Sequence, residues 1–440
     1  KRYINYLENY SYAPKCTLVT GLKLKMTNHK LNRDNLIKAY RAFALRHPLL
    51  RANIFKDQSG MPYWKEVNNY MPDLNITETP FALGIKVPEE LMSKNYIEHG
   101  IDRALVELNI LTWKNEAILL VEACHSVMDA RGLNLLARDL FKYYTDFCQG
   151  KPFDPKDPSN QAYDFPNPPF HPPMNQEFSA EKKALVEKLK QKKMDMLKEV
   201  SYTPIFPKKL DHSGEVSITM EYGSESNLSQ LKSYSRLNGL SLGTCLIATG
   251  FASIALAAKK LNIHEGHDHI PINALFVSDL TNKLYPDLRD KIVENLDSNF
   301  ITHYVSYDSN LLEVTKKVKQ VIKENNENFG NNLYIIPTNN EVLNYDFLIN
   351  VIPFTQNIDF TISDSEKINV GNYISIDQKK YGFVFPYNTM NLIISSDKLI
   401  YYLIFTDNNK EVMTEIYKIR KELSENFHSY AYQKLSDIRI

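Results

Sequence analysis

The sequence from residue 117 to residue 132 reads Ala117-Ile-Leu-Leu-Val-Glu-Ala-Cys-His125-Ser-Val-Met-Asp129-Ala-Arg-Gly132. Its apolar first part predicts a buried strand, and an amphipathic helix is predicted to begin a few residues after His125. The sequence therefore places His125 at the end of a strand, with rigid backbone behind it. Because imidazole titrates near neutral pH, a histidine in that position is suited to act as a general base.

The His-x-x-x-Asp spacing is weak evidence by itself. Among 11 histidines such a match arises about once by chance, and a second one occurs at His264 and Asp268. That match lies in a polar stretch that predicts a loop, where His267 and His269 follow. The spacing of these histidines fits no common zinc template, so we expect a solvated loop and no metal site. For His125 alone, a purely structural histidine is the open alternative.

The residues on either side predict a mixture of strands and helices. The alternation from 17 to 26 predicts a half-buried strand, and Asn32 is the expected cap of a helix that ends before His47. The stretches 106–113 and 117–124 predict a hairpin. A helix follows and is expected to stop at Gly150.

A change of composition predicts a connection between two halves. Eight prolines fall between residues 152 and 173, and they fit neither a helix nor a central strand. We therefore expect an N-terminal lobe over residues 1–175 and a C-terminal lobe over residues 176–440. A charged helix from 179 to about 200 opens the second lobe.

The second half repeats the mixture in irregular order. This interleaving favours an α/β fold with mixed sheets over a regular doubly wound sheet. Strands are expected at 215–222, 270–277, 300–307, 347–352 and 399–405, and helices at 228–237, 241–261, 311–324 and 410–422.

Four segments, in order along the chain, resemble one superfamily. Residues 117–132 resemble the HxxxDG signature of condensation domains and coenzyme A-dependent acyltransferases. Arg46-His-Pro-Leu-Leu-Arg51-Ala-Asn-Ile-Phe55 resembles the RHxxLRxxF motif of condensation domains. Residues 297–302 resemble, more loosely, a strand segment of these domains, and 228–258 resembles the helix pair that opens their second half. The chain looks closest to stand-alone alcohol acetyltransferases, because carrier and adenylation sequences are absent.

Some residues depart from that pattern. Cys124 replaces the first histidine of the common HH pair, and Ala130 replaces the glycine after the aspartate. The DFGWG motif of plant members has at most a distant counterpart in Tyr381-Gly-Phe-Val-Phe-Pro-Tyr.

The resemblance implies two similar lobes, like those of chloramphenicol acetyltransferase, with mixed sheets and an active-site tunnel between them. His125 would take the proton from the acceptor as it attacks a thioester. Asp129 would be structural, paired with an arginine that holds the loop. Arg51 is the expected partner from its place in the second motif, with Arg46 and Arg131 as alternatives.

Two further expectations concern the same site. Adjacent strand residues face opposite sides, so Cys124 should point away from His125 and be an inert buried thiol. Thr355 and Asn357 lie where alcohol acetyltransferases carry a serine-asparagine segment, and they are candidate donors to the oxyanion.

Composition narrows the partners. Lys+Arg and Asp+Glu number 52 each, so no net field attracts nucleic acid. The four cysteines form no CxxC pair, which fits a reduced compartment. The most apolar stretch, 245–258, is shorter than the roughly 20 residues of a membrane span. We expect a cytoplasmic monomer without a transmembrane segment, and peripheral attachment to a membrane or lipid droplet stays open.

These observations predict an acyltransferase that moves an acyl group to a small alcohol or amine. The expected donor is acyl-CoA, with acetyl-CoA as the first choice, used as a co-substrate and not as a bound cofactor. Two alternatives stay open. One is a stand-alone condensation enzyme with a carrier-bound donor, and the other is a non-catalytic binding protein of the same fold.

Overall fold

A computed structural model of the protein describes residues 1–5, 8, 17–68, 70, 74–80, 98–167, 173–199, 216–222, 225–263, 268–279, 285–328, 347–354, 357–375, 388–395, 398–406 and 409–440. The chain forms two compact units. Unit 1 contains Lys1–Glu177, Asp279–Leu296 and Phe354–Phe383, and unit 2 contains Phe178–Ser278, Asp297–Pro353 and Val384–Ile440.

The two units differ from the predicted lobes in one respect. The first break, after Glu177, lies close to the predicted boundary at 175. However, residues 279–296 and 354–383 belong to unit 1, whereas the sequence analysis assigned everything after residue 176 to the C-terminal lobe. Both segments reach unit 1 through long-range contacts, which local patterns do not reveal.

The main sheet of unit 1 has six strands in the order β12-β13-β2-β7-β6-β5. Its strands are β2 (Thr17–Thr27), β5 (Leu74–Glu78), β6 (Val106–Trp113), β7 (Glu116–Cys124), β12 (Ile358–Thr361) and β13 (Lys367–Ser375). The pair β5–β6 is parallel and the other pairs are antiparallel, so the sheet is mixed. A smaller sheet, β1-β4-β3, joins β1 (Arg2–Tyr3), β3 (Ala52–Lys56) and β4 (Pro62–Glu66).

Strand β7 lies inside the main sheet, between β2 and β6. Every residue from Ala117 to Cys124 is buried, as expected for a strand that is covered on both faces. The turn from β6 to β7 places Lys114 at φ 53°, which allows the tight reversal. A rigid central strand therefore ends directly at His125.

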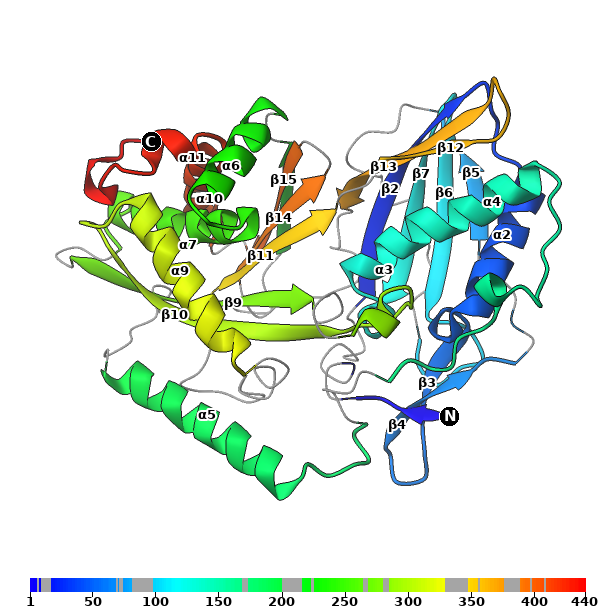
Figure 1. Ribbon diagram of the computed structural model, residues 1–440, viewed down its shortest axis with the longest axis horizontal. Coiled ribbons are helices and arrows are strands. Elements are labelled where there is room, and N and C mark those ends of the chain that lie inside the picture. The colour runs from blue at the N-terminus through cyan, green and yellow to red at the C-terminus, as the bar shows by residue number, and fades with distance from the viewer. Residues whose placement is uncertain are drawn as a thin grey trace. The chain divides into compact units, whose positions relative to one another are not determined.

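The helices of unit 1 lie along one face of this sheet (Figure 1). They are α2 (Arg33–Arg46), α3 (Ala130–Leu135), the π-helical turn η4 (Leu136–Leu140) and α4 (Phe141–Cys148). Three 3₁₀ turns accompany them: η1 (Pro48–Arg51), η3 (His125–Val127) and η5 (Pro158–Asn160). The predicted cap is confirmed, because the Asn32 side chain accepts a hydrogen bond from the Asn35 N–H.

Unit 2 is built on a second six-stranded sheet, in the order β10-β9-β11-β14-β15-β8. Its strands are β8 (Val216–Tyr222), β9 (His269–Asp279), β10 (Leu296–Ser306), β11 (Phe347–Phe354), β14 (Asn388–Ser395) and β15 (Lys398–Thr406). The pair β9–β11 is parallel and the pairs β14–β15 and β15–β8 are antiparallel. The predicted α/β class with mixed sheets is therefore confirmed.

The described residues of unit 2 form six helices. They are α5 (Ala180–Glu199), α6 (Glu225–Leu237), α7 (Leu242–Lys260), α9 (Leu311–Asn326), α10 (Lys410–Glu425) and α11 (Phe427–Tyr430). Two 3₁₀ turns complete the described elements: η6 (Pro286–Leu288) in unit 1 and η10 (Leu435–Asp437) in unit 2. Helix α7 is long and apolar enough to cross a membrane, but 83% of its most apolar window is buried within the protein. That burial is typical of a core helix.

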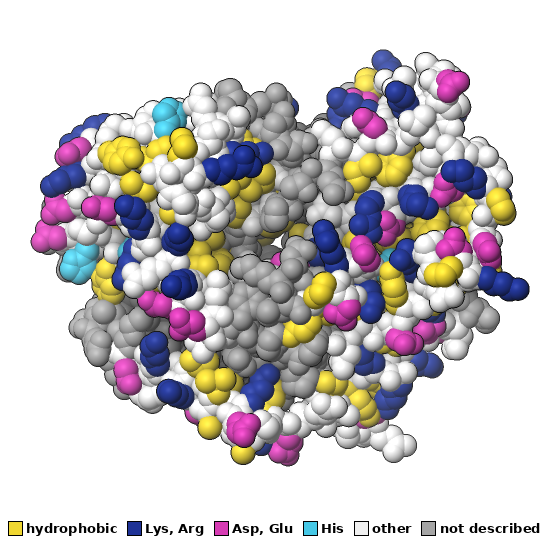
Figure 2. Space-filling model, viewed as in Figure 1, with side chains coloured by type: hydrophobic (Ala, Val, Ile, Leu, Met, Phe, Trp, Pro, Cys, Tyr) yellow, Lys and Arg dark blue, Asp and Glu magenta, His cyan; other side chains and the backbone are white. Residues whose placement is uncertain are grey.

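The surface carries charges of both signs. On the face shown in Figure 2, lysines and arginines are interspersed with aspartates and glutamates over the described residues. This distribution agrees with the equal numbers of basic and acidic residues in the sequence.

Candidate active site

His125 lies where β7 ends, as the sequence predicts. Cys124 is the last residue of the strand, and His125 begins the turn η3. The neighbours Ser126 and Val127 are buried, while the His125 side chain is 28% exposed. The imidazole is therefore held by buried backbone and reaches the surface of unit 1.

One nitrogen of the ring faces a carboxylate. The Nδ1 atom of His125 lies 3.1 Å from Oε1 of Glu294, whose side chain is only 2% exposed. The Nδ1–H direction is not aligned on that oxygen, but catalytic hydrogen bonds are often poorly aligned until the substrate complex forms. Nε2 has no hydrogen-bond partner among the described residues. This nitrogen is therefore the one available to a substrate.

The surroundings change the basicity of His125. Burial acts to lower its pKa, but the Glu294 carboxylate, the main chain of His125 itself and, to a smaller extent, Asp129 together raise the pKa above the ordinary histidine value. The imidazolium is thus stabilised by a neighbouring charge. A histidine of this kind is a stronger base than one in water.

Asp129 caps the helix that follows. Its Oδ1 accepts a hydrogen bond from the Gly132 N–H at 3.1 Å, and its Oδ2 accepts one from the Asn295 N–H at 3.4 Å. The side chain is 3% exposed. Gly132 is confined as well, because a Cβ there would lie 2.7 Å from Cβ of Met128. Asp129 therefore holds the turn after His125 and the segment that carries Glu294.

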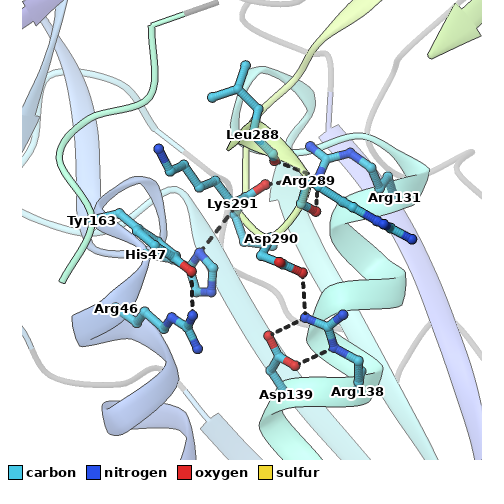
Figure 3. A network of polar contacts seen from close by, with 11 residues as sticks. Arg46, His47, Arg131, Arg138, Asp139, Tyr163, Leu288, Arg289, Asp290 and Lys291 are labelled. Carbon is cyan, nitrogen blue, oxygen red and sulfur yellow. Dashed lines mark hydrogen bonds and ion pairs between the residues drawn. The ribbon is translucent and has the colours of Figure 1, made fainter. Parts of the chain in front are cut away.

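The predicted pairing of Asp129 with an arginine is wrong. Arg51 instead forms an ion pair with Glu66 and donates from Nε to the Ala44 carbonyl. The alternatives do not pair with Asp129 either: Arg46 bonds to Tyr163, and Arg131 bonds to main-chain carbonyls (Figure 3). Two backbone N–H groups satisfy the carboxylate, so no guanidinium is needed.

We expect Asp129→Ala to destabilise unit 1. Loss of an N-cap side chain costs about 0.5–2 kcal/mol, and loss of the bond to Asn295 places the expected change at the upper end. Asp129→Asn should lower the free energy of unfolding less than Asp129→Ala, because the asparagine oxygen can still cap the helix. It should still lower it somewhat, because the amide nitrogen cannot accept the second N–H. Urea unfolding of the three proteins measures the difference. Equal midpoints for Ala, Asn and wild type would contradict the capping role.

Arg131 holds the segment that carries Glu294. Its guanidinium donates to four main-chain carbonyls at 2.8–3.2 Å, and Figure 3 shows it reaching from α3 into the loop around residues 288–291. The four acceptors belong to Leu288, Arg289, Lys291 and Val293. This loop is thereby fixed to the helix that follows His125.

His47 provides a second attachment for this loop. Its Nδ1 accepts a hydrogen bond from the Ile292 N–H at 3.2 Å. Burial, with the nearby charges of Arg46, Arg138 and Arg131, lowers the pKa of His47 to about 3. The ring therefore stays neutral and can accept that bond at any ordinary pH. This accounts for a histidine of the second motif that has no direct contact with His125.

The predicted burial of Cys124 is confirmed. The thiol is buried, and its Sγ lies 3.5 Å from Nε2 of His99 and 3.7 Å from Oγ of Ser126. Burial raises the pKa of the Cys124 thiol to about 11, so the reactive thiolate is scarce at neutral pH.

Accordingly, Cys124→Ala should leave the activity of the protein unchanged. In the wild-type protein, iodoacetamide should label Cys124 slowly at pH 7 and rapidly after unfolding, because the folded thiol is protonated and buried. Peptide mass spectrometry follows the labelling. A folded Cys124→Ala protein without activity would restore Cys124 as a candidate nucleophile.

The two predicted oxyanion donors stay untested. Thr355 lies outside the described residues. Asn357 is exposed, and its side-chain oxygen lies over Gly371 of β13, in the space that a Cβ would occupy. Asn357 belongs to the same unit as His125, but no described contact joins them.

The second histidine cluster is only partly described. His264 and His267 lie outside the described residues, and His269 is exposed at the start of β9. No group of three or more potential metal ligands occurs in the part of the chain that the structure covers.

Sequence analysis missed Glu294. It lies in Ile292-Val-Glu-Asn-Leu296, just before the segment that resembles condensation domains. An acidic residue inside a short apolar run is the available signal, because buried carboxylates are rare unless they are paired. The partner could not be named, since 169 positions separate Glu294 from His125 (294 − 125 = 169).

No protein-family model matches the sequence, and no curated protein matches it significantly. Solved structures do match, along nearly the whole chain. The first condensation domain of the CDA synthetase is 11% identical with a TM-score of 0.66, covering 100% of this chain and 99% of that one. The chain has the condensation-domain fold.

Two further structures with this fold are similar over the whole length. Polyketide synthase associated protein 5 from Mycobacterium tuberculosis is 14% identical, with a TM-score of 0.63 and coverage of 97% and 98% of the two chains. The SgcC5 protein from Streptomyces globisporus is 13% identical, with a TM-score of 0.64 and coverage of 96% and 98%. At these identities the likeness establishes the condensation-domain fold alone.

Proposed function

We propose that the protein is an acyltransferase in which His125 is the general base. The observation that carries this proposal is the geometry of one side chain. His125 stands at the end of a buried strand, with Nδ1 against a buried carboxylate and Nε2 without a partner among the described residues. The condensation-domain fold supports the same reaction class.

The proposed reaction needs no covalent enzyme intermediate. The hydroxyl oxygen or amine nitrogen of the acyl acceptor forms a bond to the thioester carbonyl carbon. At the same time, Nε2 of His125 takes the proton from that hydroxyl or amine. The tetrahedral intermediate then collapses, the carbon–sulfur bond breaks, and the proton passes from Nε2 to the leaving thiolate. A thioester is already activated, so the protonated thiol of Cys124 has no part in the sequence.

We propose acyl-CoA as the donor, with acetyl-CoA as the first to test, and a small alcohol or amine as the acceptor. An alcohol acceptor is supported by one structure with this fold, since SgcC5 is described in complex with a naphthyl ethanediol and sucrose. Acyl-CoA would be consumed in each turnover and is a co-substrate.

A carrier-bound donor is the second candidate. It is favoured by the similarity to the first condensation domain of the calcium-dependent antibiotic synthetase, described in complex with substrate analogues. The chemistry at His125 is the same for both donors, because each presents a thioester. Only the part of the donor beyond the sulfur differs.

One assay separates these proposals. Purified protein is mixed with acetyl-CoA or longer acyl-CoA and a panel of alcohols and amines, and the released thiol is measured. Acceptor-dependent release supports the acyl-CoA transferase. Release only from acyl-phosphopantetheine on a carrier protein supports the second candidate. Absence of transfer from either donor would count against an acyltransferase.

A further inference from the structure

We propose that Glu294 is a positioning residue of this active site, whose buried carboxylate holds the His125 imidazole in the tautomer that leaves Nε2 able to accept a proton. This inference deepens the proposed function and rests on it. The family resemblance named no residue that orients the imidazole, since it gave Asp129 only the role of holding the loop; the geometry assigns that orienting role to Glu294, from a different segment.

Glu294 determines which nitrogen of the neutral His125 ring carries the proton. A neutral imidazole carries one proton, and the group beside each nitrogen decides where the proton resides. An ionised carboxylate only accepts hydrogen bonds. With Oε1 of Glu294 at 3.1 Å, the proton of His125 is stabilised on Nδ1. The lone pair is then on Nε2, the nitrogen that has no partner among the described residues.

The Glu294 carboxylate is held in a fixed position. The main chain on both sides of Glu294 is anchored to the elements around His125. The Val293 carbonyl accepts from Arg131, and the Asn295 N–H donates to Asp129. Arg131 and Asp129 both belong to the start of α3. The carboxylate and the imidazole are therefore fixed to one frame, as an active site requires.

The other titratable groups around this turn have partners of their own. Both oxygens of Asp129 accept backbone N–H bonds, so this carboxylate serves the turn, although its charge also raises the pKa of His125. Glu8 approaches from the N-terminal segment, but its carboxylate is bound by Arg2 and its carbonyl by Ser126. His99 contacts Cys124, and burial with the charge of Lys56 lowers its pKa to about 4.

The Glu294 carboxylate also stabilises the charge that develops on His125 in the transition state. When Nε2 takes the proton, the ring becomes a cation 3.1 Å from a buried anion. Burial of the Glu294 carboxylate strengthens this attraction relative to that between two charges in water. The carboxylate stabilises the imidazolium more than the neutral imidazole. It therefore stabilises the transition state of the proton transfer more than the ground state, and the transfer is accelerated.

The dependence of activity on pH should report the pKa of His125. Because the Glu294 carboxylate raises the pKa of His125, the neutral, active base is lost as pH falls through that raised value. In Glu294→Gln the largest raising contribution to the pKa of His125 is absent, while burial, which lowers that pKa, remains. The acidic limb of kcat/KM should therefore move to lower pH in the variant. A merely structural defect does not move this limb.

The test compares Glu294→Gln and Glu294→Asp with Glu66→Gln, a matched control whose carboxylate is 44% exposed and pairs with Arg51. We expect Glu294→Gln to lower kcat by about 10²–10⁴-fold, the range of general base catalysis and of tautomer loss in serine proteases. Glu294→Asp should recover part of this loss. The control should match the wild type in kcat and in its pH profile.

A second readout does not depend on activity. In protein labelled with ¹⁵N-histidine, the shifts of the His125 ring nitrogens, assigned with His125→Ala, report the tautomer and its pKa. We expect an Nδ1–H tautomer in the wild type, and a lower pKa in Glu294→Gln. An unchanged tautomer and pKa in that folded variant would overturn the role of Glu294. If these shifts occur in a protein that transfers no acyl group from any donor, the dyad stands and the proposed function fails.

Discussion

In His125→Ala, acyl transfer should fall by about 10²–10⁴-fold, the range that a positioned general base supplies. The ring is attached to the end of a central strand, its side chain is 28% exposed, and its Nε2 has no partner among the described residues. Alanine provides no proton acceptor there. The remaining rate should come from substrate binding alone, and thiol release at saturating acceptor measures it.

Folding has to be separated from catalysis in this variant. Alanine removes the imidazole from beside the Glu294 carboxylate, which is only 2% exposed, and loss of a partner of a buried charge destabilises a protein. His125→Gln is therefore the companion, because its amide N–H can still donate to Glu294. Both variants should keep the wild-type circular dichroism spectrum. Full activity in a folded His125→Gln protein would remove His125 from the mechanism.

Arg131→Met should lower the free energy of unfolding of unit 1 more than any other substitution proposed above. One hydrogen bond to a charged group contributes about 1.5–3 kcal/mol, and four carbonyls lose their donor together. We expect a loss at or above the upper end of that range. The activity should fall too, because the loop that places Glu294 against His125 is released. Urea unfolding and thiol release measure the two effects.

Arg138→Met is the matched control for this change. Arg138 lies two turns further along the same helical region and binds Asp139 and Asp290 (Figure 3). Its side chain is 44% exposed, and exposed ion pairs contribute about 0–1 kcal/mol. A loss of stability in Arg138→Met as large as in Arg131→Met would show that removal of any arginine from this surface has the same effect, and would refute the specific role of Arg131.

Local patterns predicted much of the fold. The hairpin of β6 and β7, the cap at Asn32 and the break between α6 and α7 at Gly239 (φ 63°) all depend on residues close together in the sequence. The predicted Lys- and Glu-rich helix is α5, from Ala180 to Glu199. Each of these elements is decided by periodicity and by turn chemistry, which a single sequence displays.

Long-range pairings were not predictable in the same way. Strands β12 and β13 were not predicted, and β13 completes the sheet of unit 1 by pairing with β2, about 350 residues earlier, as in Ile368 with Met26. The same limit applies to the site. His125 was identified from its place on a strand, but its partner Glu294 and the true neighbour of Arg51, Glu66, are brought together only by the tertiary fold.

The three-part composition of unit 1 has a consequence for synthesis on the ribosome. Its chain is interrupted after Glu177 and completed only by the segments 279–296 and 354–383. When the first 177 residues have emerged, β2 still has an open edge, because its neighbour β13 has not yet been translated. Open edges of apolar strands invite wrong pairing. The nascent first unit must therefore wait, unfinished, for about two hundred further residues, roughly 10–40 s at typical elongation rates. A gene fragment that ends at the first break would encode neither a complete sheet nor Glu294.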